Sequence, residues 1–154
     1  MKSNYHWATN VRITTFDLNG RIIHVAEFKN LLMTVGKNMM RDVLGGVVTD
    51  GQIKYLAVGT SSTAPAIGQT TLVAEGFRKI TTSRSYPSTG VIKTIHYLSP
   101  DDALINIREM GWFAGAAATA SANTGIMVAR ILYTRNKTNL ESITVERTDT
   151  ITEA

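Results

Sequence analysis

The chain has 154 residues, 44% of them hydrophobic, a formal net charge of +4 and no cysteine. This composition suits a single globular domain with its own core, and the lack of cysteine excludes disulfides and thiolate metal sites. No apolar run approaches the roughly 18 residues of a membrane span, so we expect no membrane partner. The sixteen Lys and Arg residues are scattered, which argues against specific nucleic-acid binding. The low charge suggests that much of the surface faces protein.

The first predicted element is a β-hairpin formed by residues 11–17 and 21–28. Asn19 and Gly20 separate two runs rich in β-branched residues, and Asn-Gly favours the positive φ angles of a type I′ turn. We interpret residues 1–29 as an N-terminal hairpin and attachment segment that precedes a β-sandwich domain over residues 30–154.

One helix is predicted next, over residues 31–44, at the start of the sandwich domain. The apolar positions that recur at helical spacing include Leu32, Val35, Met39 and Val43. Asn30 is a candidate N-cap, and Gly45 and Gly46 allow the helix to end in a left-handed conformation. Glycine inside a helix costs about 1 kcal/mol relative to alanine, so Gly36 indicates close packing at that position.

The rest of the chain is predicted to be a succession of strands. They lie at residues 53–58, 77–85, 91–98, 104–113, 126–133 and 141–151, between turn signals. The last strand is the most amphipathic, with Ile143, Val145 and Ile151 on one face. Residues 114–125 are rich in Ala, Thr and Ser, which predicts a surface loop. Together these elements predict a mainly β protein, an antiparallel β-sandwich or jelly-roll-like domain of about eight strands.

The candidate sites lack the residue patterns of known chemistries. Residues 55–72 have neither the lysine of a phosphate-binding loop nor a nucleophile elbow, so we interpret them as a structural connection. The three histidines are far apart in the sequence, and Asp101 and Asp102 are not followed by the oxygen ligands of a calcium loop. We therefore expect no catalytic residue, no metal and no cofactor, and a protein that is not an enzyme.

The neighbouring aromatic residues Trp112 and Phe113 allow two interpretations. Flat apolar rings beside glycines suit the binding of a sugar or peptide, with Tyr97 as a third member. More often such a pair fills a core or a subunit contact, which is the interpretation we favour.

Several segments, in their order and spacing, resemble a family of small virion proteins of tailed bacteriophages. These segments are NMMRDVLGG, IKYLAVGTSSTAPAIGQTTL, EGFRK, IREMGWFAG, MVARILYTRNKT and SITVERTDTI, and they extend over residues 38–151. Members of this family are usually described as tail-fibre or tail-associated structural proteins. The resemblance implies a non-enzymatic, mostly β, multimeric subunit located in the virion, and it carries over no catalytic residue.

The resulting expectation is a structural subunit of the tail, the neck or the fibre attachment. Its expected partners are other virion proteins and further copies of itself in a homo-oligomer, for example a trimer. A capsid decoration, cement or head-fibre protein remains an alternative, as does a carbohydrate- or receptor-binding module that contacts a host-surface glycan. The candidate contact residues are Tyr55, Thr63, Pro65, Ile67, Trp112 and Phe113.

Overall fold

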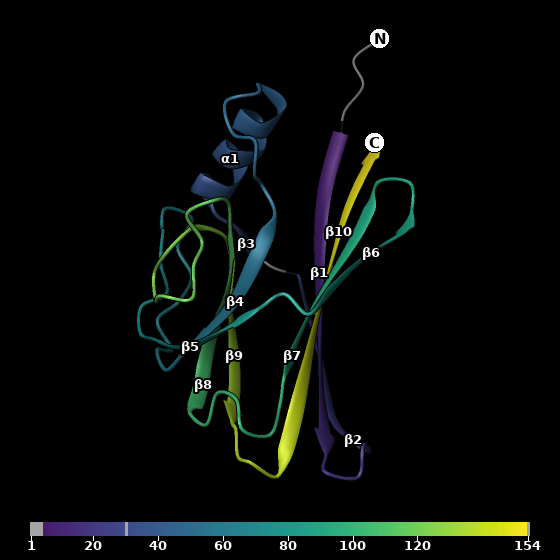
Figure 1. The fold of residues 1–154 in the computed structure, drawn as a ribbon, viewed down its shortest axis with the longest axis vertical. Helices are drawn as coiled ribbons and strands as arrows, with labels where there is room; N and C mark the ends of the chain where they lie inside the picture. The colour runs from purple at the N-terminus through teal and green to yellow at the C-terminus, as the bar shows by residue number, and fades with distance from the viewer. Residues whose placement is uncertain (1–4, 30, 154) are drawn as a thin grey trace.

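The computed structural model describes residues 5–29 and 31–153, and these residues form two antiparallel sheets that face each other (Figure 1). Sheet A contains β1 (Tyr5–Asp17), β2 (Ile22–Lys29), β6 (Ser83–Ser88), β7 (Val91–Leu98) and β10 (Glu141–Glu153), in the spatial order β2-β1-β10-β7-β6. Sheet B contains β3 (Leu31–Leu32), β4 (Ile53–Gly59), β5 (Glu75–Ile80), β8 (Asn106–Ala114) and β9 (Ile126–Asn136), in the order β3-β9-β8-β4-β5. The predicted mainly β sandwich is confirmed.

The predicted hairpin is present as β1 and β2, but its turn differs from the prediction. Gly20 has a φ of 77°, whereas Asn19 is not among the residues with positive φ, so the turn is not type I′. The Asp17 carboxylate instead accepts the N–H groups of Asn19 and Arg21 across a longer turn. Along its other edge β1 pairs with β10 over the full length of both strands. The segment interpreted as an attachment is therefore an integral part of sheet A.

The helix begins later than predicted. Helix α1 spans Thr34–Leu44, and its N-cap is Met33, which has an extended backbone and no side-chain cap. Leu31–Leu32 forms the short strand β3 against β9, and the candidate cap Asn30 lies outside the described residues. At the other end the predicted left-handed residue is found, because Gly46 has a φ of 70°.

The single strand predicted over residues 77–85 is wrong, because the chain crosses from sheet B to sheet A within it. Thr81 donates its N–H to the carbonyl oxygen of Lys54 in sheet B, and Thr82 donates to that of Ile95 in sheet A. Both halves are extended, so the residue pattern continues through the crossing. The crossing joins β5 to β6 and links the two layers of the sandwich.

The main core lies between the two sheets. Its fully buried side chains include Ile13, Leu56, Met110, Trp112, Leu98, Ile143 and Val145. Helix α1 packs on β9 at Gly36, where an added Cβ would lie 2.8 Å from the Cα atom of Val128. The close packing predicted from this glycine is therefore confirmed.

A second, smaller core covers the outer face of sheet B. Its buried members are Met33, Ala57, Leu72, Phe113, Ala118 and Met127. Leu72 and Ala118 come from two irregular segments, which we name the crossover loop (residues 60–74) and the alanine loop (residues 115–125). Figure 1 shows both loops at the left, on the side of sheet B that faces away from sheet A. They form much of the surface on this side.

Candidate interaction surface

A buried ion pair on the outer face of sheet B holds the end of the crossover loop. Glu109 of β8 and Arg130 of β9 are both fully buried, with 2.7 Å between Oε2 of Glu109 and Nη2 of Arg130. The Glu109 carboxylate also accepts the N–H groups of Val73 at 3.1 Å and Ala74 at 2.7 Å. The negative charge is thus satisfied by one guanidinium and two backbone groups of the loop.

Arg130 holds the beginning and the middle of the same loop. Its Nη2 donates to the carbonyl oxygen of Thr63 at 2.8 Å, and its Nη1 donates to Oε1 of Gln69 at 3.2 Å. The same Gln69 oxygen accepts the N–H of Ala66 at 3.0 Å. Buried charges are costly unless they have several hydrogen-bonding partners, and here most of the partners belong to the loop. The ion pair therefore gives a fixed shape to a segment without regular secondary structure.

The absence of a side chain at Gly59 lets the two ends of the crossover loop meet. An added Cβ at Gly59 would lie 2.5 Å from Oε1 of Glu109 and would also collide with the carbonyl oxygen of Ala74. That carbonyl accepts the N–H of Thr60 at 3.0 Å. A larger residue at this position would push the loop away from its ion pair.

A second ion pair fixes the alanine loop. Nε of Arg78 lies 2.6 Å from Oε1 of Glu75, and both side chains are almost completely buried. Nη1 of Arg78 donates to the carbonyl oxygens of Thr119 at 2.9 Å and Thr124 at 3.1 Å. Glu75 in turn accepts the N–H of Asn123 at 3.0 Å. Both irregular loops are thus anchored to sheet B in the same way.

Four of the predicted contact residues lie on or next to these loops. Thr63 and Ile67 are exposed in the crossover loop, and Pro65 between them is half-buried. Tyr55 on β4 is half-buried, and the guanidinium of Arg78 lies over its ring at 5.5 Å from the centroid. Three of the four therefore belong to the surface of the crossover loop, while Tyr55 supports the anchor of the alanine loop.

The other two predicted contact residues, Trp112 and Phe113, are fully buried and lie in different cores. Trp112 lies between the sheets, with the Arg147 guanidinium 5.5 Å from its ring centroid. Phe113 lies on the outer face of sheet B, with the Arg78 guanidinium 4.5 Å from its centroid. The core alternative is thus the one found, and of the three rings considered for a glycan only Tyr97 is exposed.

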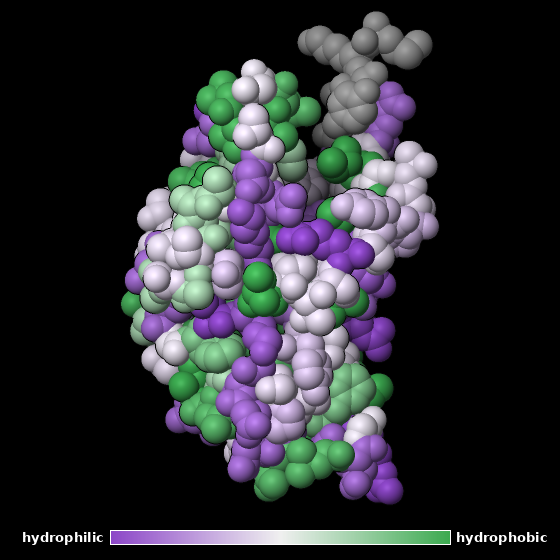
Figure 2. Space-filling model, in the orientation of Figure 1, coloured by the Kyte–Doolittle hydropathy of each residue, from purple (hydrophilic) through white to green (hydrophobic). Residues whose placement is uncertain are grey.

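The surface of the two loops is free of charged side chains. Neither the crossover loop nor the alanine loop contains Asp, Glu, Lys or Arg. Their exposed residues include Thr60, Ser62, Thr63, Ala64, Ala66, Ile67, Val73, Ala116, Ala117, Thr119, Ala120, Ser121, Ala122 and Asn123. Figure 2 shows pale green and white atoms gathered at the left, where these loops lie. Because the centres of protein interfaces are depleted in charged residues, this loop face is the candidate interaction surface.

Sequence reasoning did not identify the buried charges that shape this surface. Glu109 and Arg130 each lie within an apolar strand, and a charged residue inside such a strand is the signal that was available. On β10 the predicted face contains Ile143 and Val145 as expected. The same face also contains Arg147, which is buried, whereas Ile151 at its far end is 48% exposed and does not belong to the core.

One further buried titratable side chain, His96, lies outside these two anchors. His96 on β7 is fully buried, and its Nε2 lies 3.1 Å from Oγ1 of Thr81. Burial, together with the positive charges of Arg84 and Arg147, lowers the pKa of His96 to about 3, so the ring is neutral near pH 7. Within residues 5–29 and 31–153, no three His, Asp or Glu side chains are grouped in a way that would hold a metal ion.

Comparison of the chain with models of protein families, with curated protein sequences and with solved structures found no match. In the part of the chain that the structure describes, no helix has the length and apolar character needed to cross a membrane.

Proposed function

We propose that this protein is a non-enzymatic structural subunit of a tailed-bacteriophage virion, and that its loop face contacts neighbouring subunits of the tail, the neck or the fibre attachment. The observation that carries the proposal is a surface that is at once uncharged and firmly anchored, through the Glu109–Arg130 and Glu75–Arg78 ion pairs. The class of particle comes from the resemblance of the sequence segments to virion proteins.

Anchored, uncharged loops suit a permanent contact for two physical reasons. Loops that are ordered before binding lose less conformational entropy when a partner arrives. A surface of Ala, Thr and Ser also avoids the large free energy of removing water from unpaired charges. The buried anchors of this surface thus supply the order, and its small residues allow another chain to approach closely.

The proposal is tested by following the chain into virus particles. Mass spectrometry of purified virions is expected to detect it, and its copy number distinguishes a tail subunit from a capsid decoration subunit, of which a head holds many more copies. A variant with Ala64→Glu and Ala120→Glu places two charges on the loop face. It is expected to fold, as judged by circular dichroism, but not to enter particles.

The matched control is Thr89→Glu, at an exposed position in the turn between β6 and β7. This variant is expected to enter particles as the unaltered chain does. The proposal is wrong if the chain is missing from mature virions. Normal incorporation of the Ala64→Glu, Ala120→Glu variant would show that the loop face is not the contact.

A further inference from the structure

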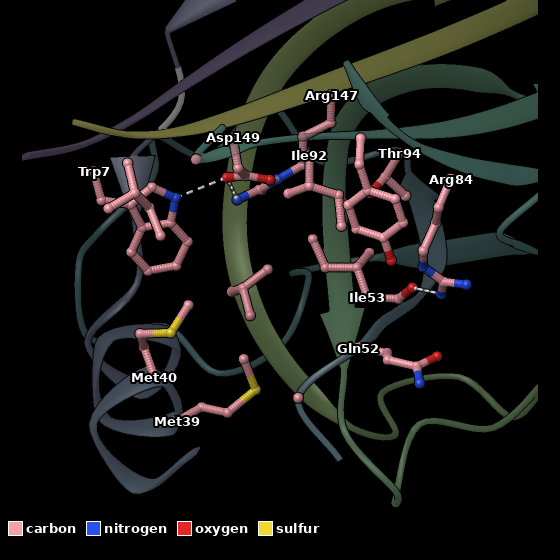
Figure 3. A pocket seen from close by; sticks show the side chains of 15 residues that line it. Trp7, Met39, Met40, Gln52, Ile53, Arg84, Ile92, Thr94, Arg147 and Asp149 are labelled. Atoms are coloured by element: carbon pink, nitrogen blue, oxygen red, sulfur yellow. Dashed lines mark hydrogen bonds and ion pairs between the residues drawn. The ribbon is translucent and has the colours of Figure 1, made fainter. Parts of the chain in front are cut away.

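A pocket of about 320 Å³ lies between the two sheets, at the end of the sandwich where α1 stands (Figure 3). Both sheets and the helix contribute to its lining. Its apolar wall includes Trp7 of β1, Met39 and Met40 of α1, Ile53 of β4 and Ile92 of β7. A space of this size, with mostly apolar walls and a few polar groups, is typical of sites that bind small molecules.

One side of the pocket carries a guanidinium without a direct ion-pair partner, although the charge of Asp50 acts on it at longer range. Arg84 of β6 lines it, and in the described part of the chain no carboxylate lies within ion-pair distance of its guanidinium. Nη2 of Arg84 donates instead to the carbonyl oxygen of Ile53. Figure 3 shows Arg84 and Gln52 on one side of the pocket and Trp7 on the other.

A second guanidinium in the lining, that of Arg147, is paired with a carboxylate of the same lining. Arg147 is fully buried and pairs with Asp149 at 2.7 Å, but its Nη1 is buried without a hydrogen-bonding partner among the described residues. Asp149 also accepts hydrogen bonds from Nε1 of Trp7 at 3.0 Å and Oγ1 of Thr9 at 2.7 Å. The lining thus contains two arginines and one aspartate, and the aspartate is already engaged.

We propose that this pocket binds a small amphipathic carboxylic acid, with its apolar body between the sheets and its carboxylate at Arg84. A guanidinium is a planar fork of donors that matches the two oxygens of a carboxylate. The apolar wall of Met39, Met40 and Ile92 disfavours a body that carries further charges. The site is separate from the loop face, which lies on the opposite side of sheet B, so it does not depend on the function proposed above.

Octanoate is a suitable probe, and 1-octanol is the matched ligand with the same chain length but no charge. Isothermal titration calorimetry of the full chain is expected to show saturable binding of one octanoate per chain. Octanol is expected to bind at least about tenfold more weakly, because a guanidinium forms stronger hydrogen bonds with a carboxylate than with a neutral hydroxyl group.

Two substitutions test the positive side of the pocket. Arg84→Gln removes the charge, and Gln52→Glu adds an opposing carboxylate of nearly the same size at an exposed position. Each is expected to weaken octanoate binding about tenfold or more and to leave the circular dichroism spectrum unchanged. The control Arg12→Gln, an exposed cation outside the pocket lining, is expected to have no effect. The proposal is overturned if octanoate does not saturate, if octanol binds equally well, if either pocket substitution leaves the affinity unchanged, or if the control weakens binding as much.

Discussion

Buried charged side chains in this protein bond mainly to backbone groups and to each other. Glu109 and Arg130 together bind the backbone of the crossover loop at Thr63, Val73 and Ala74. Removing one member of such a pair leaves the other charge buried without compensation, which destabilises a fold more than the intact pair stabilises it. These two residues are therefore expected to contribute strongly to the stability of the fold, although their side chains are not exposed at the surface.

The substitution Glu109→Gln tests this role, because it keeps the side-chain shape and removes the charge opposite Arg130. We expect the free energy of unfolding, measured by urea denaturation, to fall by about 3–5 kcal/mol. The matched control is Glu146→Gln, whose partner Lys93 lies 3.1 Å away in a pair that is about one third exposed. It is expected to change stability by less than about 1 kcal/mol. Similar losses in the two variants would contradict the assignment.

His96 is expected to make stability depend on pH. Its pKa is about 3 in the folded protein and 6.5 as the ordinary value, so between these values the unfolded chain binds one more proton than the folded chain. Stability therefore falls as the pH is lowered from 6.5 towards 3, by up to about 1.4 kcal/mol per pH unit, and the effect is absent above 6.5.

The measurement for His96 is urea denaturation at a series of pH values above about 5, where most carboxylates remain ionised. His96→Gln replaces the ring by a neutral amide that does not take up a proton. The variant is expected to lose the decline in stability that the unaltered protein shows between pH 6.5 and 5. An unchanged slope in the variant would mean that another group is responsible.

At the scale of elements, the sequence predicts structure best where one residue pattern has one physical cause. Alternation along residues 141–151 and helical spacing around Met39 each report a buried face, and both elements are found. The crossing at Thr81 and Thr82 was missed because two extended segments in different sheets have the same local pattern. The sequence does not show the true start of the helix, because Leu31 and Leu32 fit its apolar spacing although they form the strand β3 against β9.

The candidate site was predictable only in part, because its anchors are distant in sequence from its surface. The sequence predicts a structural connection over residues 55–72 and a surface loop over residues 114–125, and these ranges include most of the two loops. Glu109 and Arg130 become neighbours only through the pairing of β8 with β9. Without knowledge of that register, no spacing in the sequence relates either residue to the crossover loop.

The anchor of the alanine loop provides a prediction at this scale. Arg78→Gln removes the guanidinium that binds the carbonyl oxygens of Thr119 and Thr124. We expect amide hydrogen exchange in residues 115–125 to become about tenfold faster, while the crossover loop stays protected by its own ion pair. Arg41→Gln, on the exposed side of α1, is the control and is expected to change neither loop. Unchanged exchange in the alanine loop would contradict the anchoring role.

Across the whole molecule, the uncharged surface and the positively charged pocket lie in different regions. The outer face of sheet B is covered by uncharged loops, whereas the pocket at the α1 end combines an apolar wall with the positive charge of Arg84. The pairing of β1 with β10 joins the first and last strands of the described chain. In the proposed assembly, a contact on the loop face would leave both the pocket and the edge strand β2 uncovered.

The most direct test of the proposed function is a density map of the virion in which individual side chains are resolved. We expect the chain to be located in the tail, neck or fibre attachment, with residues 60–74 and 115–125 covered by a neighbouring subunit. A map in which these loops face solvent in every copy, or in which the chain has no place in the particle, would contradict the proposal.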